Sequence, residues 1–402
     1  MFKIEEDDYW TPPAPITYTT EEVEEFETEE DMGSPQIFSF GFDPITCHAF
    51  NKDRTQLAIS HNNNEVKIYA FKGGRWDLTN TLSEHVQRIT SIDWAPNTNR
   101  IVTCGADRNA YVWVEQGGQW KPNLVILRIN RAATYVKWSP LENKFAVGSG
   151  ARLISVCYFE QENDWWLSKH IKKPLRSTVT SLDWHPNNVL LASGSTDFSA
   201  RVFSAYVKEV DEKPAATPWG KKMTFGNVMA EFVGGGGWVH SVSFSSDGNK
   251  LAWVGHDSSV NVANAVNNNH LATIKTNFLP LMTCTWVSPY SILTAGHGCC
   301  PMLFRYDDSG NVTFVAKLDA EKKTAASKFN AMKHFQSLDT KAQTHEENQT
   351  SVNTIHQNTI SQVSIFAGDK NNTAKFVTSG VDAQLIVWDF KTLESSIAGL
   401  RI

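Results

Sequence analysis

ITSIDWAP, residues 89–96, is a phrase that the chain repeats: ATYVKWSP follows at 133–140 and VTSLDWHP at 179–186. Their tryptophans, Trp94, Trp138 and Trp184, stand 44 and 46 residues apart in a chain of 402. Each phrase alternates apolar and polar residues, which is typical of a half-buried β-strand. A period of this length predicts an array of similar units, each built from several short strands.

Looser copies of the phrase extend the array along most of the chain. They carry Phe50, Phe244, Trp286 and Ile365 at the tryptophan position, which makes seven copies. A second anchor follows the first five copies by 19 residues, the sixth by 18 and the seventh by 23; these anchors are Tyr69, Trp113, Cys157, Phe203, Ala263, Phe304 and Trp388. Each pair of anchors encloses an apolar strand, a tight turn and a second strand.

The period and the paired anchors predict an all-β fold, a seven-bladed WD40 β-propeller over residues 37–402. Before four second anchors, at a distance of six residues, stands an aspartate suited to accept backbone hydrogen bonds in a turn: Asp107, Asp197, Asp257 and Asp382. The stretch IFSFGF (37–42) is predicted to complete the sheet of Trp388 and close the ring. His85 occupies the place of the histidine typical of such repeats, which the other copies mostly lack.

Charge divides the chain into two parts. Residues 1–36 hold twelve acidic residues and one lysine, a net charge of −11, and the remainder holds 36 basic and 31 acidic residues, a net charge of +5. With its prolines and mutually repelling carboxylates, the segment 1–36 is predicted to be a disordered acidic extension. Its role is left open.

Neither a secretory signal nor a membrane-spanning run is expected. The start MFKIEEDDYW lacks a basic and then apolar segment, and no apolar run approaches about 18 residues. Four of the six cysteines lie in apolar, strand-like runs and no CxxC pair occurs, so reduced structural thiols are expected. The sequence therefore predicts a cytoplasmic protein without membrane insertion.

No catalytic, metal-binding or cofactor-binding motif stands out, and neither an enzyme nor a cofactor is expected. Basic residues cluster in two connections that precede repeat phrases: Arg128 and Arg131, then Lys169, Lys172, Lys173 and Arg176. Both connections are predicted to reach one rim of the propeller. They are either ordinary solvated loops or a site for an acidic peptide or a neighbouring subunit. Nucleic acid is disfavoured because the net charge of the propeller is modest.

An insertion separates the sixth and seventh repeats, at 312–358. Within it, KFNAMKHFQSL (328–338) predicts a short helix at about 327–338, with Ser327 as its N-cap. The apolar residues recur every third position and spread over about half of the helix circumference: Phe329, Met332, Phe335 and Leu338. A helix this short is marginal alone. It is expected either to pack back on the propeller or to dock into a groove on a partner.

Several stretches resemble a particular family more closely than a fold class. RITSIDWAPNTNRIVTCGADRNAYVW, TSLDWHPNNVLLASGS, VWDFKTLESSIAGLRI and the loop SAYVKEVDEKPAATPWGKKM are similar to the WD-repeat subunit 1 of the actin-related-protein 2/3 complex. The resemblance covers about residues 37–402. It implies a non-catalytic scaffold in the actin cytoskeleton, with other complex subunits, the actin filament and acidic nucleation-promoting activators as partners. It also implies that the insertion helix reaches toward actin.

Two other classes remain open. A generic WD40 adaptor, such as a substrate receptor of a ubiquitin ligase, would share the blades without these stretches. A propeller hydrolase would need acids or histidines that converge on the central channel, and the sequence identifies none.

Overall fold

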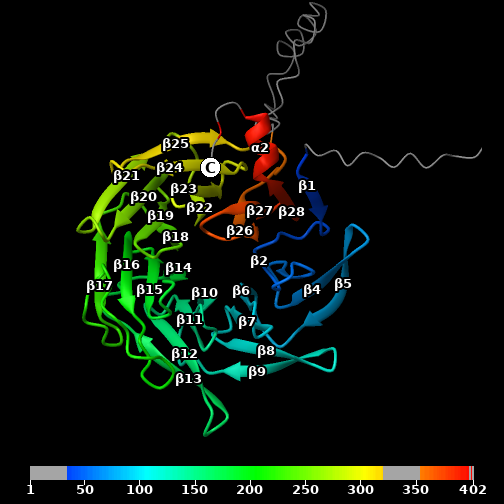
Figure 1. The fold of residues 1–402 in the computed structure, drawn as a ribbon. Coiled ribbons are helices and arrows are strands. Elements are labelled where there is room, and N and C mark those ends of the chain that lie inside the picture. Colours follow the sequence, from blue (N-terminus) through cyan, green and yellow to red (C-terminus); the bar gives the residue numbers. More distant parts are fainter. Residues whose placement is uncertain (1–33, 320–353, 398–399, 401–402) are drawn as a thin grey trace, which may run out of the picture. The chain divides into compact units, whose positions relative to one another are not determined.

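The computed structural model describes residues 34–319, 354–397 and 400. These residues form seven four-stranded antiparallel sheets arranged as blades around an axis, which confirms the seven-bladed propeller (Figure 1). None of the helices in the described ranges is long and apolar enough to cross a bilayer. The acidic extension and the predicted helix at about 327–338 lie outside these ranges.

The blades follow one another along the chain. The first three contain β2 (Cys47–Phe50), β3 (Gln56–Ser60), β4 (Val66–Lys72) and β5 (Arg75–Leu82); β6 (Ile89–Ala95), β7 (Arg100–Gly105), β8 (Ala110–Gln116) and β9 (Gln119–Val125); and β10 (Ala133–Trp138), β11 (Lys144–Ser149), β12 (Ile154–Glu160) and β13 (Trp165–Ile171).

The next three contain β14 (Val179–Trp184), β15 (Leu190–Ser195), β16 (Ser199–Ser204) and β17 (Val228–Val233); β18 (Val239–Phe244), β19 (Lys250–Gly255), β20 (Ser259–Asn264) and β21 (His270–Lys275); and β22 (Leu281–Trp286), β23 (Ser291–Gly296), β24 (Met302–Tyr306) and β25 (Val312–Lys317). Blade seven contains β26 (Ile360–Gly368), β27 (Thr373–Gly380), β28 (Gln384–Asp389) and β1 (Gln36–Ser39). In blades one to six the first strand in chain order lines the axis. In blade seven β26 lines the axis, and the outermost strand, β1, comes from the start of the chain.

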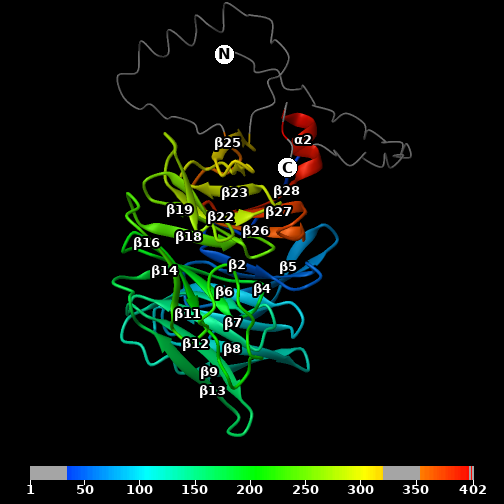
Figure 2. The ribbon, with the colours of Figure 1, turned by 60° about the vertical axis from the view of Figure 1, so that its left-hand side comes forward.

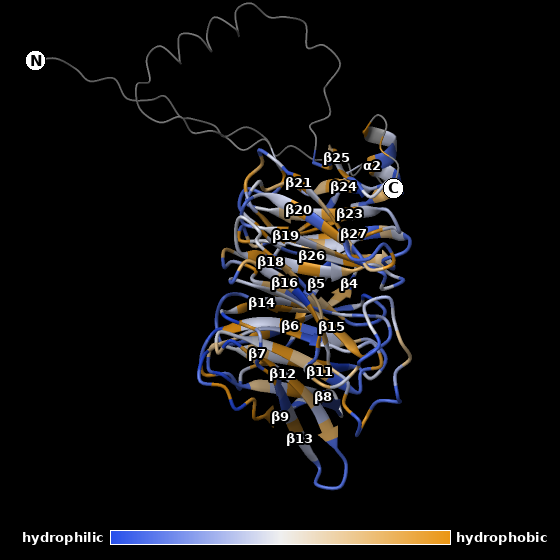
Figure 3. Ribbon diagram, turned by 90° about the vertical axis from the view of Figure 1, so that its left-hand side faces the viewer, coloured by the Kyte–Doolittle hydropathy of each residue, from blue (hydrophilic) through white to orange (hydrophobic). Residues whose placement is uncertain are grey.

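The repeat anchors form the contacts between blades. Trp94 of β6 pairs across the sheet with Ile101, which in turn pairs with Trp113 of β8. These three side chains are buried in one cluster with residues of blade one such as Ile68. A blade thus buries one face against the preceding blade, which is why the apolar pattern repeats once per blade. Figure 3 shows the outcome, with orange hydrophobic segments along the strands and blue loops at many of the turns.

Hydroxyl side chains of the axial strands join successive blades. Thr90 of blade two donates to the carbonyl oxygen of Ala133 at 2.9 Å, and Thr134 of blade three donates to that of Val179 at 2.5 Å. Thr180 of blade four makes the same bond to Val239. These bonds satisfy backbone carbonyls near the channel and hold the radial spacing of the blades.

The ring closes by pairing the first described strand with the last. β1 pairs antiparallel with β28 over four residue pairs, and Figures 1 and 2 show β26 of blade seven beside β2 of blade one. The side chain of Gln362 in β26 accepts a hydrogen bond from His48 N at 2.9 Å and donates one to His48 O at 3.0 Å. The predicted strand was 37–42; the observed strand ends at Ser39 because Gly41 has φ 107°, a turn conformation that breaks the ladder.

One further expectation is wrong, and one element was not predicted. The insertion was predicted to begin at residue 312, but 312–317 form β25, the outer strand of blade six, so the connection between strands runs over 318–359. An unpredicted helix, α2 (Phe390–Ser396), follows β28 and begins at Asp389, whose side chain accepts a hydrogen bond from Lys391 N. Phe390 and Leu393 pack into the cluster of blades six and seven, which anchors the helix.

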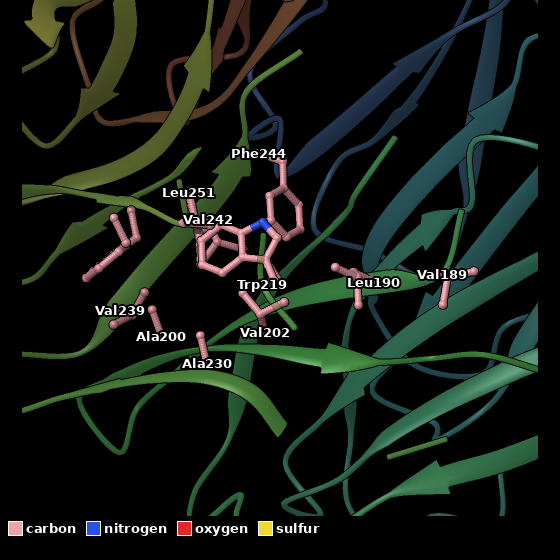
Figure 4. Packing of buried hydrophobic residues seen from close by; sticks show 14 of the residues in the cluster. Val189, Leu190, Ala200, Val202, Trp219, Ala230, Val239, Val242, Phe244 and Leu251 are labelled. Atoms are coloured by element: carbon pink, nitrogen blue, oxygen red, sulfur yellow. The ribbon is translucent and has the colours of Figure 1, made fainter. Parts of the chain in front are cut away.

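The long connection 205–227 in blade four also contacts blades three and five. Trp219 is buried between blades four and five, where Figure 4 shows it beside Phe244, and its indole N–H donates to Gly248 O at 2.7 Å. On the other side, Asp211 pairs with the buried amine of Lys144 in blade three. Asp211 also accepts from Val207 N at 2.8 Å and from the amide of Asn188 at 3.0 Å.

Candidate partner-binding face

Strand direction sorts the loops of the propeller onto two rims. In each blade the antiparallel order places the turn between the second and third strands on the same rim as the connection from one blade to the next. We call this rim the interblade rim. Gly150 N bonds Ala132 O at 2.9 Å and Ala106 N bonds Arg88 O at 2.9 Å, which joins turn and connection into one surface.

Exposed basic side chains gather on the interblade rim of blades two to four. We define the basic arc as Arg88, Arg108, Arg128, Arg131, Arg152, Lys172, Lys173 and Arg176, all of which are exposed. The same loops contain three acidic residues, Glu84, Asp107 and Asp197, and the carboxylates of the two aspartates are occupied by hydrogen bonds. The arc therefore presents a concentrated positive field although the net charge of the propeller is small.

The sequence identified part of this arc. Arg128, Arg131, Lys172, Lys173 and Arg176 lie on it as expected from the connections. Lys169 was placed in a connection incorrectly: it lies inside β13, and its amine bonds both carboxylate oxygens of Glu209 at 2.8 Å. Arg128 donates to Ser168 O, so its guanidinium is partly occupied.

Three arginines of the arc were not predicted from the sequence. Arg108 and Arg152 stand in the turns between the second and third strands, both with positive φ, at 69° and 59°. Arg88 immediately precedes the phrase ITSIDWAP. Since the turn and the connection share a rim, a search of both loops of each repeat for basic residues would have found them.

The four aspartates at the repeat turns organise this rim. One carboxylate oxygen of each accepts a hydrogen bond from a backbone amide of the preceding interblade connection: Asp107 from Val86 at 3.1 Å, Asp197 from Arg176 at 3.0 Å, Asp257 from Gly236 at 3.1 Å and Asp382 from Gln357 at 2.9 Å. Each aspartate thus fixes a flexible connection against a turn. Although burial acts to raise it, the pKa of Asp382 is held below its usual value by hydrogen bonds from His356 and from the backbone amides of Gln357 and Gln384.

A histidine network supports two of these aspartates. His85 Nδ1 lies 2.8 Å from Asp107, and His85 Nε2 lies 2.9 Å from Thr103 Oγ1, which also accepts from the Trp113 indole at 3.0 Å. His356, Asp382, Thr378 and Trp388 repeat the arrangement in blade seven. The role of His356 was not predicted from the sequence, because it stands 26 residues before its aspartate, whereas His85 stands 22 residues before Asp107. In blade four, Arg201 takes the place of the histidine and bonds both Asp197 oxygens at 2.9 Å.

Acidic and basic groups meet at the axial channel, where the sequence alone had identified none. The channel encloses a cavity of about 610 Å³ lined by the axial strands. Lys137 lies 3.2 Å from Asp93, and Lys370, from the β26–β27 turn, reaches across the ring to Asp183 at 2.6 Å. Asp93 raises the pKa of Lys137 more than burial lowers it. Each of these two carboxylates is paired with an amine: Lys137–Asp93 joins neighbouring axial strands, and Lys370–Asp183 spans the channel.

Beyond the basic arc, the interblade rim becomes apolar. Large side chains from blades four to six are exposed there: Phe198, Val233, Trp238 and Leu279. The base of the insertion follows on the same rim, where Asp319 Oδ2 accepts a hydrogen bond from Ile355 N at 2.6 Å. One rim therefore carries a positive arc, an apolar segment and the insertion, which together suit a protein partner.

Comparison with known proteins places these features in a family. Residues 76–114 and 167–204 match the family model "WD domain, G-beta repeat". The match starts in the outer strand of one blade and ends in the third strand of the next, so the sequence repeat is offset from the structural blade by one strand.

Curated relatives match most of the chain. It is 64% identical over 368 residues to actin-related protein 2/3 complex subunit 1A-B of Xenopus laevis, covering 91% of this chain and 99% of that protein. Identity to subunit 1 of Schizosaccharomyces pombe is 45%, covering 89% of this chain and all of that protein (100%). Identity to subunit 1A of Arabidopsis thaliana is 39%, covering 88% and 96%. Identity at this level, over nearly the whole length of relatives from an animal, a yeast and a plant, shows that the chain belongs to the family of actin-related protein 2/3 complex subunit 1.

Proposed function

We propose that the chain is the non-catalytic propeller subunit of an actin-related protein 2/3 complex in the cytoplasmic actin cytoskeleton. In this role it scaffolds neighbouring subunits and contacts acidic activators and the actin filament during branched nucleation. The observation that carries the proposal is the 64% identity that extends over 99% of a subunit 1 relative. The paired charges of the axial channel support a structural use of that cavity.

The basic arc is the proposed site for acidic activators. The turn aspartates Asp107 and Asp197 hold two of its connections in place, so less conformational entropy is lost there when a peptide binds. A positive surface of this kind accelerates the encounter with an acidic segment and favours it over neutral partners.

Neutralising four members of the arc is expected to weaken binding of an acidic activator peptide about tenfold at low salt. The variant carries Arg131→Ala, Arg152→Ala, Lys172→Ala and Lys173→Ala. Fluorescence anisotropy across a salt series measures the affinity, and the difference from wild type should shrink as ionic strength rises because the field is screened.

A second quadruple variant controls for the loss of charge alone. Four exposed lysines outside the interblade rim serve as matched sites: Lys52, Lys72, Lys208 and Lys221. Changing them to alanine removes the same charge and should leave the affinity within about twofold of wild type. Equal losses in both variants would show that the activator responds to net charge and has no site on the arc.

The insertion is the proposed contact with actin. The Asp319–Ile355 hydrogen bond closes its base, so whatever it carries leaves the propeller from a fixed point on the interblade rim. The predicted helix at about 327–338 would present Phe329, Met332, Phe335 and Leu338 to a groove on the partner.

A Phe329→Ala, Phe335→Ala double variant is expected to assemble into the complex normally and to lower the branching rate at least threefold. The reason is that a short amphipathic helix binds through a few large apolar side chains. Counting branches by fluorescence microscopy with the reconstituted complex measures the effect. Thermal denaturation of the chain is the control. A destabilised propeller would show that these side chains pack on the blades. A normal branching rate would show that the helix makes no functional contact with actin.

A further inference from the structure

Two histidines face each other on the apolar segment of the interblade rim. Nε2 of His240, the second residue of β18, lies 2.9 Å from Nδ1 of His256, which follows β19. The ring centroids are 5.1 Å apart. The partly exposed indole of Trp238 packs against His256 with a centroid distance of 5.6 Å. His256 itself is exposed, so solvent and small ions reach the pair.

The position of His240 is a break in the propeller pattern. In blades two to four the second residue of the axial strand is a threonine that donates to the next blade: Thr90, Thr134 and Thr180. Blade five has His240 there, and its ring turns to the neighbouring turn of its own blade. The His240 side chain therefore does not take the role that threonine has at this position, which is to join one blade to the next.

The hydrogen bond between the rings defines which nitrogens are available. An N–H···N bond needs a proton on one nitrogen and a lone pair on the other, so the two nitrogens share one proton. Neutral imidazole nitrogens that converge on one point are ligands for zinc and related ions.

We propose that His240 and His256 form a two-histidine site for a divalent ion of the zinc type, which takes the place of the shared proton. That proton moves to the outer nitrogen of the same ring, so both rings stay neutral and both inner lone pairs face the ion. With Zn–N bonds of about 2.0–2.1 Å and tetrahedral angles, the two nitrogens need a separation of about 3.3 Å. Because His256 stands in an exposed turn, its ring can move so that the two nitrogens separate from 2.9 Å to this distance.

The site has two protein ligands and open positions. Within the ranges that the structure describes, no group of three or more histidine, cysteine, aspartate or glutamate residues is placed to hold a metal. His297 has a partner of its own, since its Nδ1 lies 2.9 Å from Thr359 Oγ1. The thiols do not compete, because all six cysteines are buried and free and burial raises the pKa of each. The remaining coordination positions are open to water.

The test is a titration of the full 402-residue chain with Zn²⁺ alone, by isothermal calorimetry at pH 7.2, in wild type and three single variants. His240→Gln and His256→Gln each remove one ligand and are expected to weaken the binding event at this site more than tenfold. His270→Gln changes an exposed histidine on β21 outside the pair and should match wild type.

His256 is exposed, so His256→Gln is expected to retain the wild-type melting temperature and decides the result if His240→Gln is unstable. A Zn²⁺ affinity and stoichiometry unchanged by His256→Gln would overturn the site, as would equal losses in His256→Gln and His270→Gln.

Discussion

Removing residues 1–42 is expected to lower the free energy of unfolding by on the order of 4 kcal/mol. The truncation takes away β1 and thus the outer strand of blade seven, with its four residue pairs to β28. It also removes Phe38 and Phe40, whose rings pack on Trp76 and Tyr69 at 6.2 and 4.8 Å. The freed edge of β28 would then face solvent, and the ring would lose the sheet that joins its two ends.

Removing residues 1–34 is the matched control. The compact unit begins at Pro35, so this shorter truncation keeps β1 and should leave the denaturant midpoint of wild type unchanged. Chemical denaturation followed by tryptophan fluorescence compares the two truncations. If both unfold at the same denaturant concentration, β1 does not contribute to ring closure and the assignment fails.

Asp211→Ala is expected to cost about 3–5 kcal/mol, because it leaves the ammonium group of Lys144 buried without a counter-charge. The Lys144 side chain has no exposed surface, and that of Asp211 is 2% exposed. Burial lowers the pKa of Lys144, and the bond to Asp211 opposes that shift. The substitution also removes the acceptor for Val207 N, which frees the start of the connection 205–227 that contacts blades three to five.

A second variant separates the lost charge from lost packing. Lys144→Met combined with Asp211→Leu replaces the pair by apolar side chains and should recover most of the loss, since neither residue then carries a buried charge. The neighbouring, exposed Glu212→Ala should change the free energy of unfolding by less than about 0.5 kcal/mol. Should Asp211→Ala melt like Glu212→Ala, the buried ion pair makes no contribution to stability.

The sequence predicted the fold well because its signal repeats. Trp94, Trp138 and Trp184 occupy equivalent axial strands, and Trp113 and Phe203 occupy equivalent third strands, so one local pattern specified most blades. The errors lie where the chain departs from the repeat. Gly41 ends β1 early through its backbone conformation, and α2 depends on contacts of Phe390 and Leu393 with two blades, which local propensity does not report.

The candidate site was predicted only in part, for a topological reason. Residues of one connection, such as Lys172 and Lys173, were found together because they are neighbours in sequence. Arg152 joins them only because antiparallel pairing brings its turn to the same rim. Lys370 and Asp183 are 187 residues apart, and only the closed ring brings their charges to 2.6 Å.

The central claim, that this chain is subunit 1 of an actin-related protein 2/3 complex, is tested most directly by its stoichiometric partners. The measurement is single-step affinity purification of the full chain, tagged at its natural expression level, followed by native mass spectrometry of the intact assembly. If the chain is that subunit, the spectrum will show one assembly that contains this chain, actin-related proteins 2 and 3 and the small subunits in equal amounts. A monomer, or an assembly with cullin-type ubiquitin-ligase subunits and no actin-related protein, would contradict it.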